Sequence, residues 1–190
     1  MKLIYKLATI GALVVSTTAC QTTSKINSDL GYNQGDVVQA LVNIHIDSKG
    51  NRINTLNYQL ANVAPVCTEF TIDSVGSKVI KLTANGAQYS YILSKHTSKA
   101  GQSLADNFNL FFGDKCDNGK ISKLSKLDKK GIEQGKALLG MSKEGVLFAM
   151  GYPPIHANPT IESNNWLYWR NRFGKRAIEF SEQGKVINIR

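Results

Sequence analysis

Apolar and polar residues alternate through residues 36–100, and this pattern predicts a β-rich region. In DVVQALVNIHID the alternation places one set of aliphatic side chains on one face of an extended strand: Val38, Ala40, Val42, Ile44 and Ile46. SKGN at 48–51 predicts a hairpin turn, and RINTLNYQL resumes the strand pattern. CTEFTIDSV, KVIKLTA and AQYSYIL follow at short intervals, with a turn at Asn85-Gly86. We therefore expect an antiparallel β-rich domain over residues 36–128.

Two short stretches have the spacing of helices instead. In SLADNFNLFFG, residues 103–113, Ser103 can cap a helix that carries one apolar stripe. In GMSKEGVLFAMGYPP, residues 140–154, Ser142 is the expected N-cap. Gly151 suits the end of this helix, because glycine adopts a left-handed conformation without a Cβ penalty. KKGIEQGKALL, just before it, predicts another helix that two glycines weaken.

Between the two predicted domains lies the basic stretch KISKLSKLDKK, residues 120–130. Its apolar residues recur at a spacing of three, which is compatible with an amphipathic segment on a membrane surface. We expect instead a linker or a short solvated element, and we place the domain boundary near residue 128. The second domain then covers residues 129–190.

Three strand patterns end the chain: NNWLYWRNRF, RAIEFSE and KVINIR, with turns at Gly174-Lys175 and Gly184. In the first of them, alternation separates Leu167, Trp169 and Phe173 from Trp166, Tyr168, Arg170 and Arg172. Two helices followed by three strands predict a small ααβββ domain, because a sheet needs a cover for its apolar face. The expected fold class is therefore α+β, with an antiparallel β-rich N-terminal domain containing a short helix.

These C-terminal motifs resemble the SmpA/OmlA family, also called BamE. The matching segments are GMSKEGVLFAMGYP at 140–153, WLYW at 166–169 and AIEFSEQGKVINI at 177–189, in the order and spacing of the family. The resemblance covers residues 129–190, about a third of the chain. It implies an outer-membrane lipoprotein that serves as a non-enzymatic accessory or scaffold subunit, as in the machinery that inserts β-barrel proteins. The additional β-rich domain and the basic residues 170–172 depart from the family pattern.

Residues 1–19 have the pattern of a bacterial lipoprotein signal peptide. Two lysines give a cationic start, a run of about nine apolar residues follows, and small residues lead to Cys20. Cys20 is the expected acylation site, which would anchor the chain in outer-membrane lipid, and residues 20–35 the expected flexible tether. Secretion without a lipid is the alternative, because Thr17 stands where lipoprotein signals usually place an aliphatic residue. Gln21 after the cysteine favours the outer membrane. We expect the protein on its periplasmic side, with the cell surface as the alternative.

If Cys20 is acylated, Cys67 and Cys116 remain as an even pair in an oxidising compartment. We expect a disulfide between them, with two separate buried thiols as the alternative. The formal net charge is +9 and becomes +7 when the two lysines of the signal are removed. In the cell envelope the polyanions available are lipid headgroups, lipopolysaccharide and acidic proteins. We therefore expect no nucleic-acid partner.

We expect no catalytic residue, metal site or cofactor. His45 lies in an alternating strand, on the face opposite its aliphatic residues, and His96 and His156 lie in predicted loops, so the histidines lack the spacing of metal ligands. The chain has neither a nucleophile elbow nor a Gly-rich phosphate loop.

The strongest candidate is a binding surface on the first C-terminal strand, formed by Trp166, Tyr168, Arg170 and Arg172. Aromatic and arginine side chains are common in protein hot spots, and arginine also pairs with phosphate. The alternative is that one face of this strand is packed and the other only solvated. Because two helices cover one face only, either Trp166 or Trp169 needs another cover: the first domain, a partner or lipid.

The expected function is a lipid-anchored scaffold or accessory subunit in outer-membrane assembly or envelope maintenance, with barrel-assembly subunits as partners. One alternative is an adaptor in an envelope secretion apparatus, with secretion subunits as partners. A second alternative is a binder of an anionic lipid or glycolipid headgroup. A third, an inhibitor of a periplasmic enzyme, depends on fold analogy alone.

Overall fold

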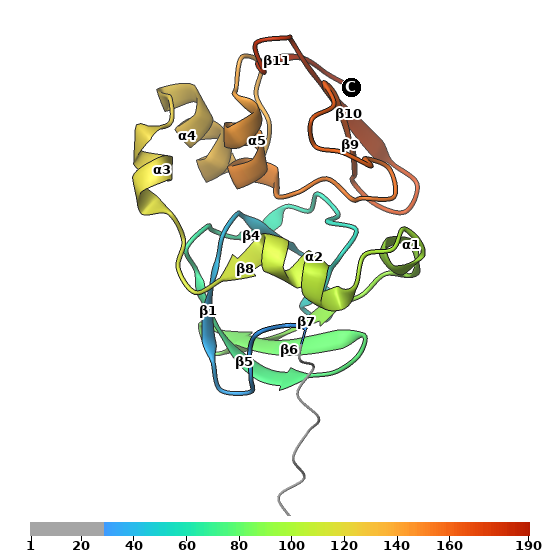
Figure 1. Ribbon diagram of the computed structural model, residues 1–190. Coiled ribbons are helices and arrows are strands. Elements are labelled where there is room, and N and C mark those ends of the chain that lie inside the picture. Colours follow the sequence, from blue (N-terminus) through green and yellow to red (C-terminus); the bar gives the residue numbers. More distant parts are fainter. Residues whose placement is uncertain (1–28) are drawn as a thin grey trace, which may run out of the picture.

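The computed structural model describes residues 29–190, which form two units that pack against each other (Figure 1). The signal peptide, Cys20 and the first part of the expected tether lie outside the described residues. The last part of the tether packs against the first core, because Leu30 is buried there and the Gly35 N–H donates to the Ile72 carbonyl. The prediction of a flexible tether is therefore wrong for residues 29–35. No helix within residues 29–190 is long and apolar enough to cross a membrane.

The N-terminal unit, residues 29–117, contains a curled six-stranded sheet in the order β3-β7-β6-β5-β1-β8. The strands are β1 (Val37–Ala40), β3 (Arg52–Asn54), β5 (Glu69–Val75), β6 (Val79–Ala84), β7 (Ala87–Ile92) and β8 (Phe112–Gly113). A separate two-stranded sheet joins β2 (Ile44–Ile46) to β4 (Asn62–Ala64). Two helices follow the β7 strand: α1 (Lys95–Lys99) and α2 (Leu104–Phe111). Side chains of α2 share the first core with the large sheet.

Local signals correctly predicted the central part of this unit. Asn85 and Gly86 both have positive φ, of 50° and 75°, as a two-residue type I′ hairpin between β6 and β7 requires. Ser103 caps α2 as expected, in a capping box with Asp106. The pairing partners of other strands were not visible in the alternating pattern.

Two features of the large sheet differ from the prediction. The strand expected over residues 36–47 is interrupted after Ala40, so that β1 and β2 belong to different sheets. Val38 and Ile46 are nevertheless both buried in the first core, because the chain bends around that core. In addition, β3 pairs with β7 in parallel, so the sheet is not purely antiparallel. A period of two identifies buried positions without identifying the partner strand.

The expected disulfide between Cys67 and Cys116 is confirmed. Its two Cα atoms are 5.2 Å apart, and it joins the segment before β5 to the segment after β8. Cys67 has a positive φ of 68°, which is uncommon for a non-glycine residue. The bond closes the outer edge of the large sheet, where β1 pairs with both β5 and β8.

The C-terminal unit, residues 118–190, contains the expected three-stranded antiparallel sheet, in the order β11-β10-β9. Its elements are α3 (Asn118–Lys123), α4 (Lys126–Gln134), α5 (Lys143–Met150), β9 (Asn165–Trp169), β10 (Lys175–Phe180) and β11 (Val186–Ile189). Ser142 caps α5, and Gly151 ends it with a φ of +71°. The boundary expected near residue 128 falls inside α4.

Two buried asparagines of the N-terminal unit join it to the C-terminal unit. Asn43, which is 2% exposed, donates from Nδ2 to the carbonyls of Ile132 and Ala149, at 2.7 and 3.2 Å. Asn57 donates from Nδ2 to the Met150 carbonyl at 2.7 Å. These carbonyls lie in the last turns of α4 and α5, where carbonyls lack the N–H partner of a regular helix; Ile132 also accepts from the capping N–H of Gly135 at 3.1 Å. The N-terminal unit thus caps two helices of its neighbour, and we call this contact the seam.

Candidate binding surface

Strand β9 turns to the core the same face that the sequence analysis assigned to partner binding. Trp166 and Tyr168 are 1% and 0% exposed and belong to the second core, together with residues of α5. The Tyr168 hydroxyl donates to the Gly151 carbonyl at 2.9 Å, which connects β9 to the end of α5. The prediction that Trp166 and Tyr168 form an exposed binding face is therefore wrong. The helices cover this face, where the two aromatic side chains bury the most apolar area.

The free edge of β9 is closed from within the chain, and the His156 ring stacks on Trp169, on the other face of the strand. The side chain of Asn158 accepts from the Leu167 N–H at 2.7 Å and donates to its carbonyl at 2.8 Å, so it replaces a neighbouring strand. The Gln59 N–H of the N-terminal unit donates to the Trp169 carbonyl at 2.8 Å. The second tryptophan is thus half-buried, and the free edge of β9 is closed.

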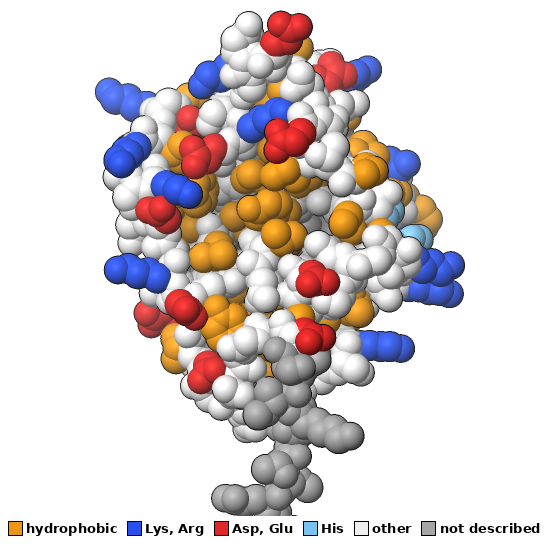
Figure 2. All heavy atoms as spheres, viewed as in Figure 1, with side chains coloured by type: hydrophobic (Ala, Val, Ile, Leu, Met, Phe, Trp, Pro, Cys, Tyr) orange, Lys and Arg blue, Asp and Glu red, His pale blue; other side chains and the backbone are white. Residues whose placement is uncertain are grey.

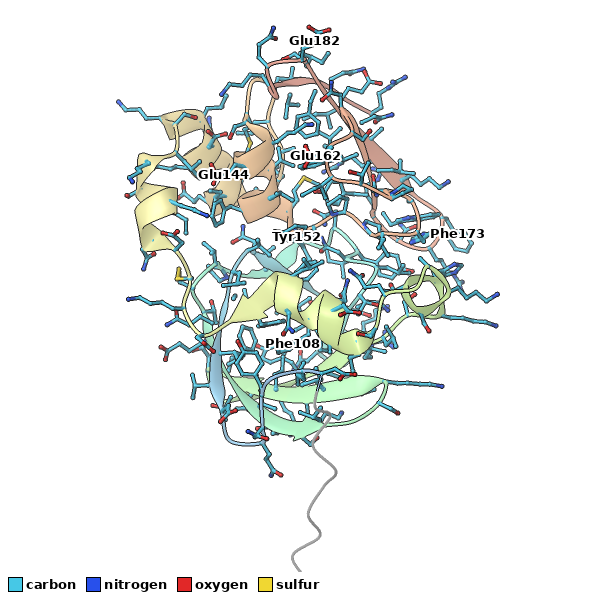
Figure 3. All side chains as sticks on the ribbon, in the orientation of Figure 1. Phe108, Glu144, Tyr152, Glu162, Phe173 and Glu182 are labelled. Carbon is cyan, nitrogen blue, oxygen red and sulfur yellow. A yellow bond between two sulfur atoms is a disulfide. The ribbon has the colours of Figure 1, made fainter. Side chains whose placement is uncertain are left out.

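Beyond Trp169 the chain leaves the core and forms the turn of the β9–β10 hairpin. The Arg170 N–H donates to the Gly174 carbonyl at 2.8 Å, and Asn171 Oδ1 accepts from the N–H groups of Phe173 and Gly174, both at 2.8 Å. Phe173 is 80% exposed and lies at the periphery of the molecule (Figure 3). We call residues 169–175 the basic–aromatic tip.

The cations of the tip lie on aromatic rings and not beside carboxylates. The Arg172 guanidinium carbon is 4.6 Å from the centroid of the Phe173 ring, and Lys175 Nζ is 4.7 Å from that of Trp169. Within residues 29–190, the ion pairs of the structure include none from Arg170, Arg172 or Lys175. The tip therefore carries uncompensated positive charge beside an exposed phenyl ring.

Helix α1 extends the same basic face. The ring centroids of His96 and His156 are 5.3 Å apart, and those of His156 and Trp169 are 5.9 Å apart. This stack places the exposed α1 lysines, Lys95 and Lys99, next to the tip, and Lys and Arg side chains gather at this edge in Figure 2. Burial lowers the pKa of His156, and the nearby His96 and Lys175 lower it further. The charge of this face at neutral pH thus comes from lysine and arginine.

A hollow of about 280 Å³ lies between α2 and α5, away from the tip. Hydrophobic side chains form a patch there, at the centre of Figure 2. Leu110, Phe148 and Tyr152 contribute its apolar wall, and Lys120 and Glu144 lie at its rim. Charges of both signs line it, so it selects for neither sign. It is an apolar groove without a feature that identifies its occupant.

His45 is 5% exposed, and its Nδ1 lies 2.7 Å from the Leu60 carbonyl, to which it donates. Burial lowers the pKa of His45, which favours the neutral ring. The face opposite the aliphatic residues, where the sequence analysis placed this histidine, is therefore buried as well. Within residues 29–190, no group of three or more His, Cys, Asp or Glu side chains has the arrangement of a metal site.

Arg170 and Arg172 are exposed at the tip, as the sequence analysis expected, and Phe173, which the alternation placed with Leu167 and Trp169 on the other face, is exposed there as well. Strand β9 ends at Trp169, four residues before the end of the predicted strand pattern at Phe173, so alternation no longer applies at Phe173. The contribution of α1 was missed, although Ser94 is the kind of residue that caps a helix.

No protein-family model, curated protein or solved structure matches this chain. The candidate surface is therefore identified by its geometry.

Proposed function

We propose that this protein is a non-enzymatic scaffold or accessory subunit of the outer membrane, anchored on the periplasmic side through an acylated Cys20. The basic–aromatic tip is its contact surface for an envelope protein. The lipoprotein pattern of residues 1–20 supports the anchor. The helices α4 and α5 over a three-stranded antiparallel sheet agree with the arrangement that the SmpA/OmlA resemblance implies.

The observation that carries this proposal is the exposure of Phe173 among cations that have no ionic partner in residues 29–190. A phenyl ring on a protein surface loses the free energy that burial would provide, about 1.5–3 kcal/mol for a side chain of this size. Arginine and aromatic side chains dominate the energetics of many protein interfaces. An acidic partner surface with an apolar depression would bury Phe173 and neutralise Arg170 and Arg172.

Site-specific crosslinking in intact cells tests the proposal. A photoreactive residue at position 173 should give an adduct with a specific envelope protein, identified by mass spectrometry. Position 166 is the buried control, and Glu182, exposed on the β10–β11 turn (Figure 3), is the surface control. Barrel-assembly subunits among the adducts would support the scaffold function, and secretion subunits would support the adaptor alternative. Equal adducts from positions 173 and 182 would reject the tip as a specific surface.

A second candidate function is binding to an anionic lipid surface, which the combination of Phe173 and three exposed cations favours. Such a tip can attract phosphate headgroups and insert one aromatic ring at the interface. A Cys20→Ser chain should bind phosphatidylcholine vesicles more tightly as their phosphatidylglycerol content rises. Arg170→Ala with Arg172→Ala should abolish this dependence. Equal binding to neutral and anionic vesicles would reject this function.

A further inference from the structure

A cavity of about 480 Å³ lies where the tip meets the N-terminal unit, and part of the tip lines it. Arg52, Asn54 and Tyr58 of the N-terminal unit line it, together with Asn171 and Arg172 of the tip. Both units are therefore needed to form it. Its size suits a ligand comparable to a monosaccharide with one substituent.

Hydrogen-bond donors outnumber free acceptors in this cavity. Asn171 Oδ1 already accepts from two backbone N–H groups of the turn, and Asn54 Oδ1 accepts from the Leu56 N–H at 2.9 Å. Each amide therefore keeps its NH₂ group for another partner. The Leu60 carbonyl, at the cavity wall, already accepts from His45. A ligand rich in acceptors satisfies these groups better than one rich in donors.

Charge in the cavity favours an anion. Asp47 is the one acidic residue of the lining, and one Arg52 nitrogen already pairs with it. The remaining N–H groups of Arg52 and all of those of Arg172 have no ion-pair partner in residues 29–190. A phosphate group presents three oxygens, so it can accept from guanidinium groups on two sides, whereas a carboxylate presents two.

The rest of the lining is apolar or aromatic. Leu60 and Ile92 contribute aliphatic surface, and Tyr58 contributes a half-buried ring. Sugar rings have apolar C–H faces that pack on such side chains, while their hydroxyls accept from amide NH₂ groups. A phosphate bound to a sugar therefore matches the cavity better than inorganic phosphate, which leaves the apolar part unfilled.

We propose that this cavity binds a phosphorylated sugar unit, with its phosphate between Arg52 and Arg172 and its ring against Tyr58. The ligand is either a free sugar phosphate or the phosphorylated sugar headgroup of a glycolipid. The site does not depend on the scaffold function, because none of its contacts requires a protein partner. Failure of the crosslinking test would leave it intact, and its own failure would leave the scaffold proposal intact.

Calorimetry on the mature chain in a neutral detergent tests the site with three soluble probes: glucosamine 1-phosphate, glucosamine and inorganic phosphate. The sugar phosphate should bind at least about tenfold more tightly than either of the others, since each lacks one half of the recognised chemistry. Equal binding of inorganic phosphate and sugar phosphate would overturn the proposal. The proposal would also be overturned if the chain bound neither the soluble sugar phosphate nor vesicles that display a phosphorylated glucosamine glycolipid.

Variants separate the cavity from the general charge of the tip. Arg172→Ala should weaken binding about tenfold or more, as expected for the loss of a charge-assisted hydrogen bond, while Arg170→Ala, the matched control outside the cavity, should change it less than about twofold. Asn54→Asp keeps the acceptor for the Leu56 N–H and replaces the NH₂ donor by an oxygen, so it should also weaken binding. Equal losses in Arg170→Ala and Arg172→Ala would overturn the proposal.

The source of the ligand is decided by comparing the free sugar phosphate with the glycolipid vesicles. Binding of both, with the same sensitivity to Arg172→Ala, identifies the headgroup as sufficient. Binding to the vesicles alone, again lost in Arg172→Ala but not in Phe173→Ala, identifies a lipid-bound ligand. Vesicle binding that is lost in Phe173→Ala and unaffected by Asn54→Asp would belong to the outward surface, and the cavity proposal would fail.

Discussion

The N-terminal and C-terminal units are built from contacts of different range. In the C-terminal unit, partners follow one another along the chain: β9 pairs with β10, and β10 with β11. In the N-terminal unit, β1 pairs with β5 and β8, so that Val37 lies opposite Thr71 and Gln39 opposite Gly113. Closing such long loops costs conformational entropy before any contact is gained. The N-terminal unit therefore has more to gain from a covalent link.

The helices of the C-terminal unit have their two ends capped by different units. In the C-terminal unit, Asp128 accepts from the Ser142 N–H at 2.8 Å and from the Ser125 hydroxyl at 2.7 Å, so one carboxylate connects the starts of α4 and α5. The last turns of the same helices are capped from the other unit by Asn43 and Asn57. The C-terminal unit is thus self-sufficient at one end of its helices and dependent on its neighbour at the other.

Removing the disulfide should have the largest effect. Replacing Cys67 and Cys116 together by Ser opens a loop with a sequence separation of 49 residues. In the chain-entropy model this lowers the free energy of unfolding by ~4 kcal/mol, because the unfolded chain gains conformational freedom. Urea unfolding followed by circular dichroism measures the change.

Reduction of the unmodified chain is the control for this double substitution. A reductant should lower the unfolding midpoint of the wild-type chain toward that of the double variant and leave the variant unchanged. A loss below about 1 kcal/mol in the variant would show that the long-range pairing of β1 does not depend on the bond.

Weakening the seam should have the second largest effect on stability. Asn43→Ala leaves the Ile132 and Ala149 carbonyls and the Val66 N–H without the partner that Asn43 provides, which should cost about 3 kcal/mol. Both tryptophans, Trp166 and Trp169, lie in the C-terminal unit, so fluorescence reports that unit while circular dichroism reports the whole chain.

For the wild-type chain, the fluorescence and circular dichroism transitions should coincide. In Asn43→Ala the fluorescence transition should move to lower urea than the circular dichroism transition, because the C-terminal unit loses the caps that Asn43 provides. Asn109→Ala, at an exposed position, is the control and should change stability by no more than about 0.5 kcal/mol. Coincident transitions in Asn43→Ala would mean that other contacts are sufficient to couple the units.

The third prediction compares two Ser-x-x-Asp caps within the same chain. Asp128→Asn removes one of two acceptors at a buried position and should cost about 2 kcal/mol. Asp106→Asn changes the same motif at the exposed start of α2, where it serves one helix, and should cost less than about 1 kcal/mol. Thermal unfolding of the two variants measures the difference. Equal losses would indicate that the connection from Asp128 to Ser142 contributes nothing.

The range of contacts also explains which parts of the fold could be predicted from the sequence. Ser103, Ser142 and the Asn85-Gly86 turn act within a few residues, so their roles were visible in the pattern and are confirmed. The interruption between β1 and β2 leaves the period of two intact, because both strands contribute to one core. The parallel pairing of β3 with β7 depends on how distant strands meet, which no local signal encodes.

The candidate surface shows the same limit. The alternation in β9 correctly separated Trp166 and Tyr168 from Leu167 and Trp169, but it could not decide which pair faces the helices. The decision depends on contacts from elsewhere in the chain: Asn158 and Gln59 close the free edge of β9, and His156 stacks on Trp169. The cavity was equally invisible, because Arg52 and Arg172 become neighbours only after the two units pack.

The smallest effect is expected from pH, and it tests the buried His45 on β2. Burial lowers the pKa of His45 below its ordinary value of 6.5, so the unfolded chain binds more protons than the folded chain as the pH falls through that region. The free energy of unfolding should therefore decrease from about pH 7.5 to about pH 5. His156, whose pKa is lowered as well, should contribute in the same direction.

His45→Asn isolates the first contribution. The asparagine side chain retains an N–H donor for the Leu60 carbonyl but has no titratable proton, so stability should depend less steeply on pH than in the wild-type chain. Urea midpoints of both chains across the same pH range measure the two slopes. Parallel slopes would assign the pH dependence to His156, in the ring stack between α1 and the tip. The acid-sensitive contact would then be the surface that we propose for binding, and not the buried hydrogen bond from His45 to Leu60 within the N-terminal unit.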